Sequence, residues 1–277
     1  MMRSVTLPDG RTVPALGLGT WYMGESAGAH DAEVRALQTG IDLGMTLIDT
    51  AEMYADGGAE EVVCDAIQGR RDRVFIVSKV LPYKASRKGT IAACEDSLRR
   101  LGTDHIDLYL LHWPGSHPLA ETVAAFEALQ ADGKIGGYGV SNFDVAEMAA
   151  WEKAAGHGAC QTDQVLYNLS RRGIEWDLLP WARERKMPLM AYSPLEQGRL
   201  AHDVLQSIAE KHGATAMQIA LSWVLRDPAM IAIPKASNPV HVQANRAALE
   251  LDLDTEDMEA LDLCFPPPRR KQALDVL

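Results

Sequence analysis

Short apolar runs typical of buried strands alternate along this chain with amphipathic stretches typical of helices, and eight such pairs follow one another. Strands that alternate with helices pair in parallel, because a parallel neighbour needs a long crossover connection. Eight units fit a closed (β/α)8 TIM barrel better than an open sheet, and such a barrel takes about 250 residues. The chain has 277 residues and no linker-like segment, so we predict one barrel domain spanning 1–277.

The periodicity gives approximate bounds for these elements. The predicted strands cover 15–19, 45–49, 74–79, 108–112, 135–140, 162–165, 189–192 and 230–233. The predicted helices cover about 30–43, 59–67, 91–101, 119–131, 144–155, 174–186 and 216–224, with a last one from about 239. A long loop is expected before the helix at 216–224.

Two segments lie outside the repeat. Residues 4–13 contain Pro8-Asp9-Gly10 between short β-prone stretches, which indicates a β-hairpin. We expect this hairpin to cap the bottom of the barrel. The tail after Phe265 begins with three prolines and is too proline-rich for a helix, so we expect it to lie over the surface. Asp107, inside an apolar strand, is not explained by the sequence.

Composition excludes several classes of partner. The formal net charge of −11 argues against nucleic acid and anionic membranes, which both need clustered Lys and Arg. Four well-separated cysteines form no Cys-x-x-Cys pair, which favours free thiols in a reducing compartment. The first residues lack the apolar core of a signal peptide, and no histidine spacing suggests a metal site. We expect a cytoplasmic monomer that acts on a small molecule.

Four polar side chains stand at or just beyond predicted strand ends. Asp49, Lys79 and His112 each close an apolar run, and Tyr54 lies in the loop that follows Asp49. In a parallel barrel all four would meet at the C-terminal rim, where barrel enzymes carry out their chemistry. A phenol beside an ammonium group can serve as a proton donor, and we expect Lys79 to lower the pKa of Tyr54. The arrangement predicts an enzyme.

The predicted strand ends carry seven motifs that resemble those of one family. They are Gly17-Leu18-Gly19-Thr20-Trp21, Leu47-Ile48-Asp49-Thr50-Ala51 with Tyr54, Val77-Ser78-Lys79, Leu110-Leu111-His112-Trp113-Pro114, Gly139-Val140-Ser141-Asn142-Phe143, Tyr192-Ser193-Pro194-Leu195 and Ile233-Pro234-Lys235. In this order the chain resembles the aldo-keto reductases, NAD(P)H-dependent carbonyl reductases on a (β/α)8 barrel. Within that family, residues 21–24 and 50–58 are most similar to the bacterial methylglyoxal reductase subgroup.

The resemblance implies a role for each of the four polar residues. Tyr54 would be the general acid, Lys79 would supply the positive charge beside it, and Asp49 would hold Lys79 in an ion pair. His112 would hydrogen-bond the carbonyl oxygen of the substrate. Trp21, Met53 and Trp113 would wall the substrate pocket together with Tyr54 and His112. Because the loops around it are short, the pocket should be open, which favours small aldehydes and dicarbonyls such as methylglyoxal.

The resemblance also implies a cofactor site. Ser141, Asn142 and Gln164 would bind the nicotinamide carboxamide, Tyr192 would stack on its ring, and the loop from Ser193 would lie against the pyrophosphate. The full set that the resemblance implies is Gly19, Thr20, Trp21, Asp49, Ser141, Asn142, Gln164, Tyr192, Ser193, Pro194, Leu195, Gln197, Gly198, Ile233, Pro234, Lys235, Ala236, Ser237, His241 and Asn245.

The segment after the eighth predicted strand bears on the choice of cofactor. Asn238 is predicted to cap a helix whose free N–H groups face an anion, with the cation Lys235 just before it. The arginine that often clasps the 2′-phosphate of NADPH in the family is matched by His241, and an acidic residue near the adenine by Ala244. Lys235 and Ser237 could still bind that phosphate, so we expect NADPH, with NADH left open.

Two other functions remain open from the sequence. One is a lyase or aldolase barrel in which Lys79 forms a Schiff base with the substrate, which would require a lysine of depressed pKa. The other is a regulatory subunit that binds the cofactor and lets a partner protein read its redox state. Oxidation of NADPH in the presence of methylglyoxal would separate the three functions.

Overall fold

The computed structural model describes residues 2–277, and it contains an eight-stranded parallel sheet in the order β3 to β10. Every strand pairs in parallel with the next one along the chain, as the alternation of strands and helices predicts. The strands are β3 (Leu18–Gly19), β4 (Leu47–Asp49), β5 (Phe75–Val80), β6 (Leu108–Leu111), β7 (Tyr138–Ser141), β8 (Cys160–Leu166), β9 (Leu189–Tyr192) and β10 (Met230–Ala232).

The sheet closes on itself between its first and last strands. Leu16 bridges to Ala232 and Gly19 to Lys235, both in parallel, and the Gly19 N–H donates to the carbonyl of Pro234 at 3.1 Å. A Cβ atom at Gly19 would lie 2.6 Å from the Ile233 carbonyl oxygen, so the backbones can approach this closely only because residue 19 is a glycine. The predicted (β/α)8 barrel is confirmed.

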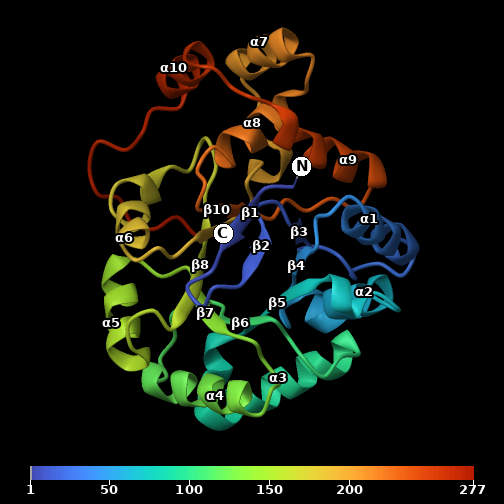
Figure 1. Ribbon diagram of the computed structural model, residues 1–277, viewed down its shortest axis with the longest axis vertical. Coiled ribbons are helices and arrows are strands. Elements are labelled where there is room, and N and C mark those ends of the chain that lie inside the picture. The colour runs from blue at the N-terminus through green and yellow to red at the C-terminus, as the bar shows by residue number, and fades with distance from the viewer. Residues whose placement is uncertain (1) are drawn as a thin grey trace.

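Helices surround the barrel, one after each strand, as Figure 1 shows in the view along its axis. They form the outer layer of the fold and bury their apolar faces against the strands. They are α1 (His30–Asp42), α2 (Gly58–Ala66), α3 (Arg87–Leu101), α4 (Leu119–Ala131), α5 (Val145–Ala155), α6 (Leu178–Glu184), α8 (Ala216–Val224) and α9 (Pro239–Ala247). Among residues 2–277, no helix is long and apolar enough to cross a bilayer.

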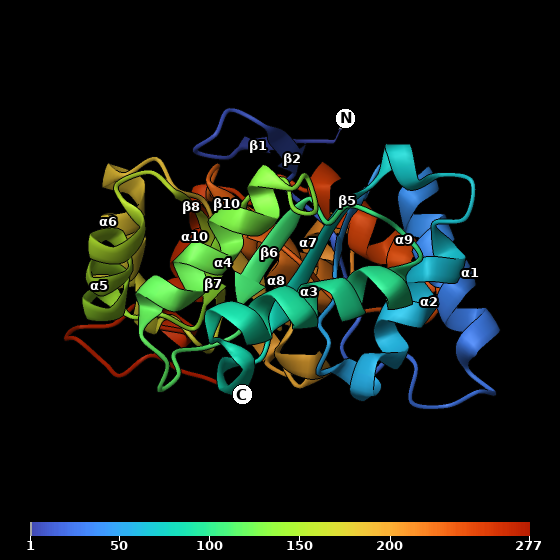
Figure 2. The same ribbon diagram turned by 90° about the horizontal axis from the view of Figure 1, so that it is seen from below.

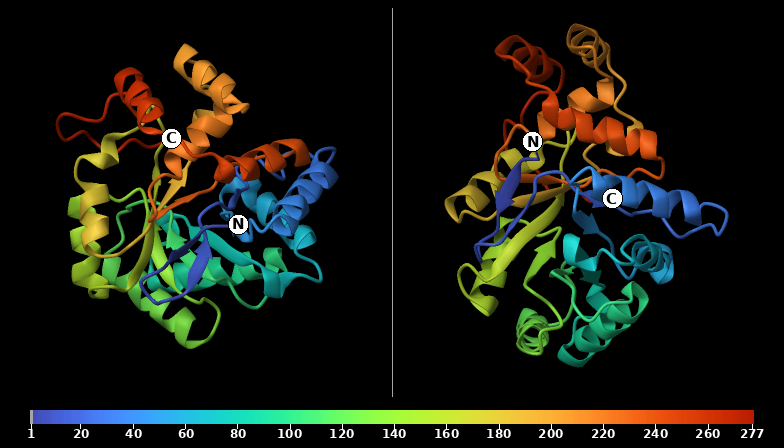
Figure 3. Two further views of the ribbon diagram at one scale, coloured as in Figure 1. Left: turned by 45° about the horizontal axis from the view of Figure 1, so that its top comes forward. Right: turned by 45° about the vertical axis from the view of Figure 1, so that its right-hand side comes forward.

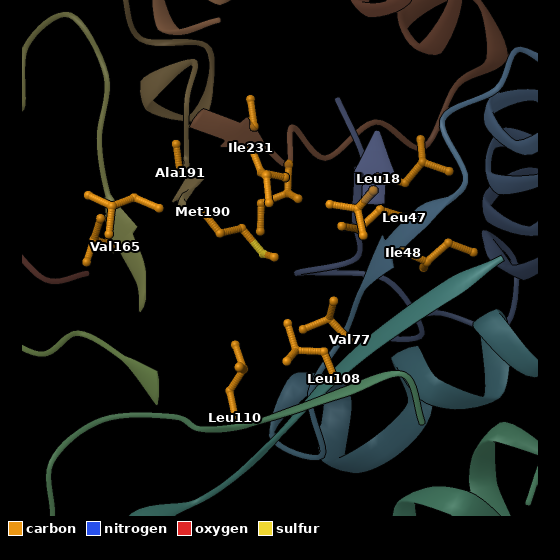
Figure 4. Close-up of a cluster of buried hydrophobic side chains, with 14 of the residues drawn as sticks. Leu18, Leu47, Ile48, Val77, Leu108, Leu110, Val165, Met190, Ala191 and Ile231 are labelled. Carbon is orange, nitrogen blue, oxygen red and sulfur yellow. The ribbon is translucent and has the colours of Figure 1, made fainter. Parts of the chain in front are cut away.

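Aliphatic side chains from the strands form the main buried cluster, which Figure 4 shows in close-up. The labelled side chains are Leu18, Leu47, Ile48, Val77, Leu108, Leu110, Val165, Met190, Ala191 and Ile231. All of them are buried, and each large aliphatic side chain withdrawn from water contributes roughly 1.5–3 kcal/mol. The polar side chains at the strand ends therefore stand on a dense apolar support.

The N-terminal hairpin consists of β1 (Ser4–Thr6) and β2 (Thr12–Pro14), paired antiparallel. The Asp9 N–H donates to Oε1 of Gln161 at 3.0 Å, and Arg11 donates to the carbonyl of Asp107 at 2.9 Å. Both acceptors belong to the N-terminal ends of barrel strands, so the hairpin caps the bottom of the barrel as predicted. Figure 2 shows the hairpin and the C-terminal residue at opposite ends of the molecule.

The carboxylate of Asp107, unexplained by the sequence, also serves the bottom of the barrel. Its Oδ2 atom accepts the backbone N–H of Ile76 at 2.9 Å and the guanidinium of Arg71 at 2.8 Å. The side chain thus ties β5 and the start of β6 to the turn before β5, and its role is structural.

Two helices lie outside the predicted pattern. The long loop after β9 contains α7 (Asp203–His212), and α10 (Thr255–Cys264) follows α9. Lys211 of α7 pairs with Asp254 and Asp257 at 2.7 and 2.8 Å, and Figure 3 shows both helices beyond the ring of barrel helices. The prediction of a loop at this point was wrong, because one helix for each strand left no place for α7.

Several other features differ from the prediction. The strand predicted at 135–140 begins at Tyr138, although Ile135 still bridges to Ile106. The helix predicted at 174–186 divides into a short 3-10 turn, Gly173–Glu175, and α6. The tail runs over the surface, tied by ion pairs between Lys271 and Asp177 and between Arg171 and Asp275, but its last two residues turn into a cavity.

Candidate active site

A cavity of about 750 Å³ opens at the C-terminal ends of the barrel strands. Nearly every residue predicted for the site from the sequence lines it. The predicted residues found there are Gly19, Thr20, Trp21, Asp49, Met53, Tyr54, His112, Trp113, Ser141, Asn142, Gln164, Tyr192, Ser193, Pro194, Leu195, Gln197, Gly198, Ile233, Pro234, Lys235, Ala236, His241 and Asn245. Lys79 lies just beneath its floor, fully buried, and Ser237 is half-buried outside the lining.

Lys79 joins the polar groups at the floor of the cavity. Its ammonium donates to Oδ1 of Asp49 and to the carbonyl of Thr50, both at 2.8 Å, and to the Tyr54 hydroxyl at 3.2 Å. An ammonium group has three donors, and all three are used here. The amine and the phenol therefore point at one another, as the predicted chemistry requires.

The backbone after Tyr54 is strained. Ala55 and Asp56 both have φ of 51°, in the left-handed region, and Gly57 follows with φ of 95° before α2 begins. A residue with a side chain pays about 1–2 kcal/mol to adopt this conformation. This tight turn connects Tyr54, whose hydroxyl lies at the floor of the cavity, directly to α2.

Burial dominates the protonation of the three coupled groups. It raises the pKa of Asp49, against the opposing effect of Lys79, and it lowers the pKa of Lys79, against the opposing effect of Asp49. The pKa of Tyr54 is raised well above its ordinary value, first by burial and then by the charge of Asp49. The expectation that Lys79 lowers the pKa of Tyr54 is therefore wrong for the free protein, since burial and the charge of Asp49 outweigh the effect of the ammonium group. Tyr54 is held protonated.

His112 is held neutral above the same floor. Burial and the nearby charge of Lys79 lower the pKa of its imidazole to about 2. The ring lies edge-on to Tyr54, with centroids 5.8 Å apart, and its Nδ1 atom has no hydrogen-bond partner among residues 2–277. A neutral imidazole carries one N–H donor, which suits it to bind an uncharged carbonyl oxygen.

Amide and hydroxyl groups cover the adjoining wall. The Gln164 side chain donates from Nε2 to Oδ1 of Asp49 at 2.7 Å, and the Gln164 backbone carbonyl accepts the Ser141 hydroxyl at 2.8 Å. Asn142 donates from Nδ2 to the His112 carbonyl at 3.1 Å and accepts the Tyr192 hydroxyl at 2.9 Å. The wall is thus hydrogen-bonded to the floor of the cavity.

The far end of the cavity is suited to an anion. Asn238 caps α9 by accepting the Val240 N–H at 2.9 Å, and Pro239 occupies the first turn, as predicted. The exposed Lys235 stands before this helix start, and His241 and Asn245 of α9 line the cavity. A cation and a helix N-terminus together favour a phosphate.

Six lining residues are outside the predicted set, one of them Ala244, whose position the resemblance places near the adenine. Tyr22 stacks on Trp21 with ring centroids 4.6 Å apart. Thr215 and Met217 stand at the start of α8, and the capping box of Thr215 with Gln218 was a usable signal for that position. The last two residues, Val276 and Leu277, also line the cavity, and no local pattern could place them.

Known proteins resemble this chain in sequence and in fold. A model of the Aldo/keto reductase family matches residues 15–265. The chain is 53% identical over 272 residues to methylglyoxal reductase YeaE of Escherichia coli K12, covering 96% of each chain, and 33% identical over 260 residues to glyoxal reductase of Bacillus subtilis, covering 94% and 91%. A crystal structure of an aldo-keto reductase from Klebsiella pneumoniae in complex with NADPH is 52% identical, with a TM-score of 0.96 and full coverage of both chains.

Proposed function

This chain belongs to the aldo/keto reductase family, and we propose that it reduces small aldehydes and dicarbonyls such as methylglyoxal to alcohols with NADPH. The observation that supports this most directly is the buried Asp49–Lys79–Tyr54 cluster, with Tyr54 and the neutral His112 both facing the cavity. Two of the relatives named above are named as reductases of methylglyoxal and of glyoxal, which are small dicarbonyls. The chain itself supplies a proton donor and an oxygen-binding donor side by side.

The cavity fits a nicotinamide dinucleotide phosphate in its chemistry. Ser141, Asn142 and Gln164 offer the amide and hydroxyl groups for a carboxamide beside the catalytic cluster, and Tyr192 offers a flat ring. Lys235 and the start of α9 offer positive charge at the other end. NADPH bound in this way supplies the hydride that carbonyl reduction needs.

The residues of the chain handle the proton. His112 donates its N–H to the carbonyl oxygen and orients it, without a charge of its own. Tyr54 then gives its proton to the oxygen as negative charge develops there. An alkoxide is far more basic than a phenolate, so this transfer is downhill even from a phenol of raised pKa. Lys79, already donating to the Tyr54 oxygen, stabilises the phenolate that forms.

The Schiff-base alternative is not favoured. Lys79 is fully buried, does not line the cavity and uses all three of its donors in the ion pair and hydrogen bonds described above. A nucleophilic amine needs a free lone pair that faces the substrate.

The test is NADPH oxidation at 340 nm with methylglyoxal. Turnover by the wild type is expected, and Tyr54→Phe should lose nearly all kcat while still binding NADPH. Tyr83→Phe is the matched control, because Tyr83 is 68% exposed and outside the cavity. Full activity of Tyr54→Phe, or no NADPH oxidation by the wild type with any small aldehyde, would refute the proposal.

We further propose that the protein works as a monomer in the cytoplasm. The cysteines described are all free thiols, which suits a reducing compartment. Sedimentation equilibrium of the active protein would test the monomer, with a mass of 30.3 kDa expected.

A further inference from the structure

A buried carboxyl group lies behind the amide wall of the cavity, and the proposed chemistry does not use it. Asp163 is the residue of β8 directly before Gln164, and it is fully shielded from solvent. Its Oδ1 atom accepts the backbone N–H of Phe143 at 3.4 Å, and its Oδ2 atom finds no partner among residues 2–277. A buried carboxyl with so few partners is costly, so its presence calls for a reason.

The N–H that Asp163 accepts belongs to the turn that carries the wall. The chain leaves β7 at Asn142, whose φ of 61° lies in the left-handed region that residues other than glycine rarely adopt. The Asn142 N–H still bonds the Gln164 carbonyl at 2.9 Å, but the next N–H, that of Phe143, has turned away from the sheet to the side chain of Asp163. Gln164 thus accepts the N–H of the strained Asn142, and Asp163 accepts the N–H of the residue that follows it.

Asn142 in turn organises its surroundings. Its side chain bonds the carbonyl of His112, the hydroxyl of Ser141 and the hydroxyl of Tyr192, so it joins the ends of β6, β7 and β9. If the backbone at Asn142 relaxed, all three bonds would be disturbed. These are the groups that face the nicotinamide end of the cavity.

We propose that Asp163 is a positioning residue for the nicotinamide, acting through the Phe143 N–H to hold Asn142 in its left-handed conformation. The proposal rests on the proposed function, since it concerns the nicotinamide half of NADPH. Asp163 is not among the residues that line the cavity. It affects the nicotinamide through the shape of the amide wall.

The surroundings indicate which form of the carboxyl does this. Burial raises the pKa of Asp163 well above its ordinary value, the Phe143 N–H opposes the rise, and Glu147 and Asp144 at the start of α5 add to it. Cys160 on β8 and Tyr192 on β9 are the other titratable groups coupled to it. No cation is among these groups, so only the Phe143 N–H opposes the effect of burial, which favours the protonated carboxyl.

The experiment separates the two halves of the cofactor. Dissociation constants are measured for NADPH and for adenosine 2′,5′-bisphosphate, which has the adenine and the 2′-phosphate but no nicotinamide. Asp163→Leu, which keeps the approximate shape without an acceptor, should bind NADPH roughly tenfold more weakly and the bisphosphate within about twofold of the wild type. If that variant does not fold, the same pair of constants is measured on Asp163→Ala. Equal weakening for both ligands, or for neither, would overturn the proposal.

Asp163→Asn is the matched control and provides a second test. Its amide oxygen can still accept the Phe143 N–H, and it cannot ionise, so both affinities should equal those of the wild type at pH 7. Because asparagine keeps the acceptor, the loss of NADPH affinity seen in Asp163→Leu should be absent in Asp163→Asn. Equal weakening of NADPH binding in the two variants would count against the proposal. Failure of the wild type to bind NADPH at all would instead refute the proposed function.

Discussion

Gln164 donates a hydrogen bond from its Nε2 atom to Oδ1 of Asp49 at 2.7 Å, at the floor of the cavity. The same carboxylate oxygen accepts the Lys79 ammonium at 2.8 Å. Gln164, proposed to bind the cofactor, and Lys79, proposed to support the acid, therefore share one acceptor. A substitution at either residue should alter the hydrogen bond made by the other.

Removal of the Lys79 charge should destabilise the protein more than removal of the whole ion pair. In Lys79→Met the buried Asp49 loses its counter-ion and keeps one side-chain donor, at a cost of about 3–5 kcal/mol. The double variant Lys79→Met with Asp49→Asn should recover much of that loss, although both proteins should be inactive. Urea denaturation of the two variants measures the difference, and equal stabilities would show that the buried charge is not the cause.

Acid should destabilise the wild type partly through His112. Its folded pKa of about 2 lies below the ordinary 6.5, so the unfolded chain binds the extra proton first and stability falls as the pH drops from about 6.5 toward 2. His112→Gln lacks this group and should lose less stability over the accessible part of that range. Urea midpoints of both proteins from pH 7.5 to 4.5 test this, because contributions from other groups are common to the pair. Parallel curves would contradict it.

His241→Arg should sharpen the preference for NADPH over NADH. His241 lines the cavity on the first turns of α9, where a guanidinium could bind the 2′-phosphate through two hydrogen bonds. The ratio of kcat/KM with NADPH to kcat/KM with NADH should rise by roughly tenfold, because kcat/KM with NADPH increases. His117→Arg, outside the cavity, is the control for added charge. A similar rise in both variants would argue against a local contact.

Gly24→Ala should impair turnover as well as stability. A Cβ atom at Gly24 would lie 2.3 Å from the carbonyl carbon of Gly58, which opens α2 directly after the strained turn that follows Tyr54. Gly10→Ala is the control, because Gly10 also has a positive φ but has nothing within 4 Å. Both variants should lose about 1 kcal/mol from backbone strain, and Gly24→Ala about 1–3 kcal/mol more.

The activity assay separates the two alanine variants further. The kcat for methylglyoxal should fall in Gly24→Ala alone, since only this substitution displaces the backbone beside Tyr54. Unchanged kcat in Gly24→Ala, despite a lower midpoint of unfolding, would show that the Tyr54 turn tolerates the shift.

Much of this fold and its site could be predicted because strand ends are local features. Asp49, Lys79 and His112 each follow an apolar run, and a parallel barrel brings such positions to one rim. Contacts that depend on the path of the whole chain could not be predicted. The approach of Leu277 to the cavity is one example.

The direction of the Tyr54 pKa was the main error in the chemistry. The sequence shows that an ammonium group is near the phenol, but it does not show how deeply both are buried. Nor does it show that the charge of Asp49 also acts on the phenol and raises its pKa. Desolvation is a property of the packed structure, and here it outweighs the nearest cation.

The hairpin at the bottom of the barrel has a practical consequence. Its turn carries Gly10, around which there is open space, and it lies at the end of the molecule opposite the last residue of the chain. If the protein were attached to a solid support, or fused to a reporter domain, at this turn, the mouth of the barrel would still face the solvent. The immobilised protein should then meet its reactants as freely as it does in solution.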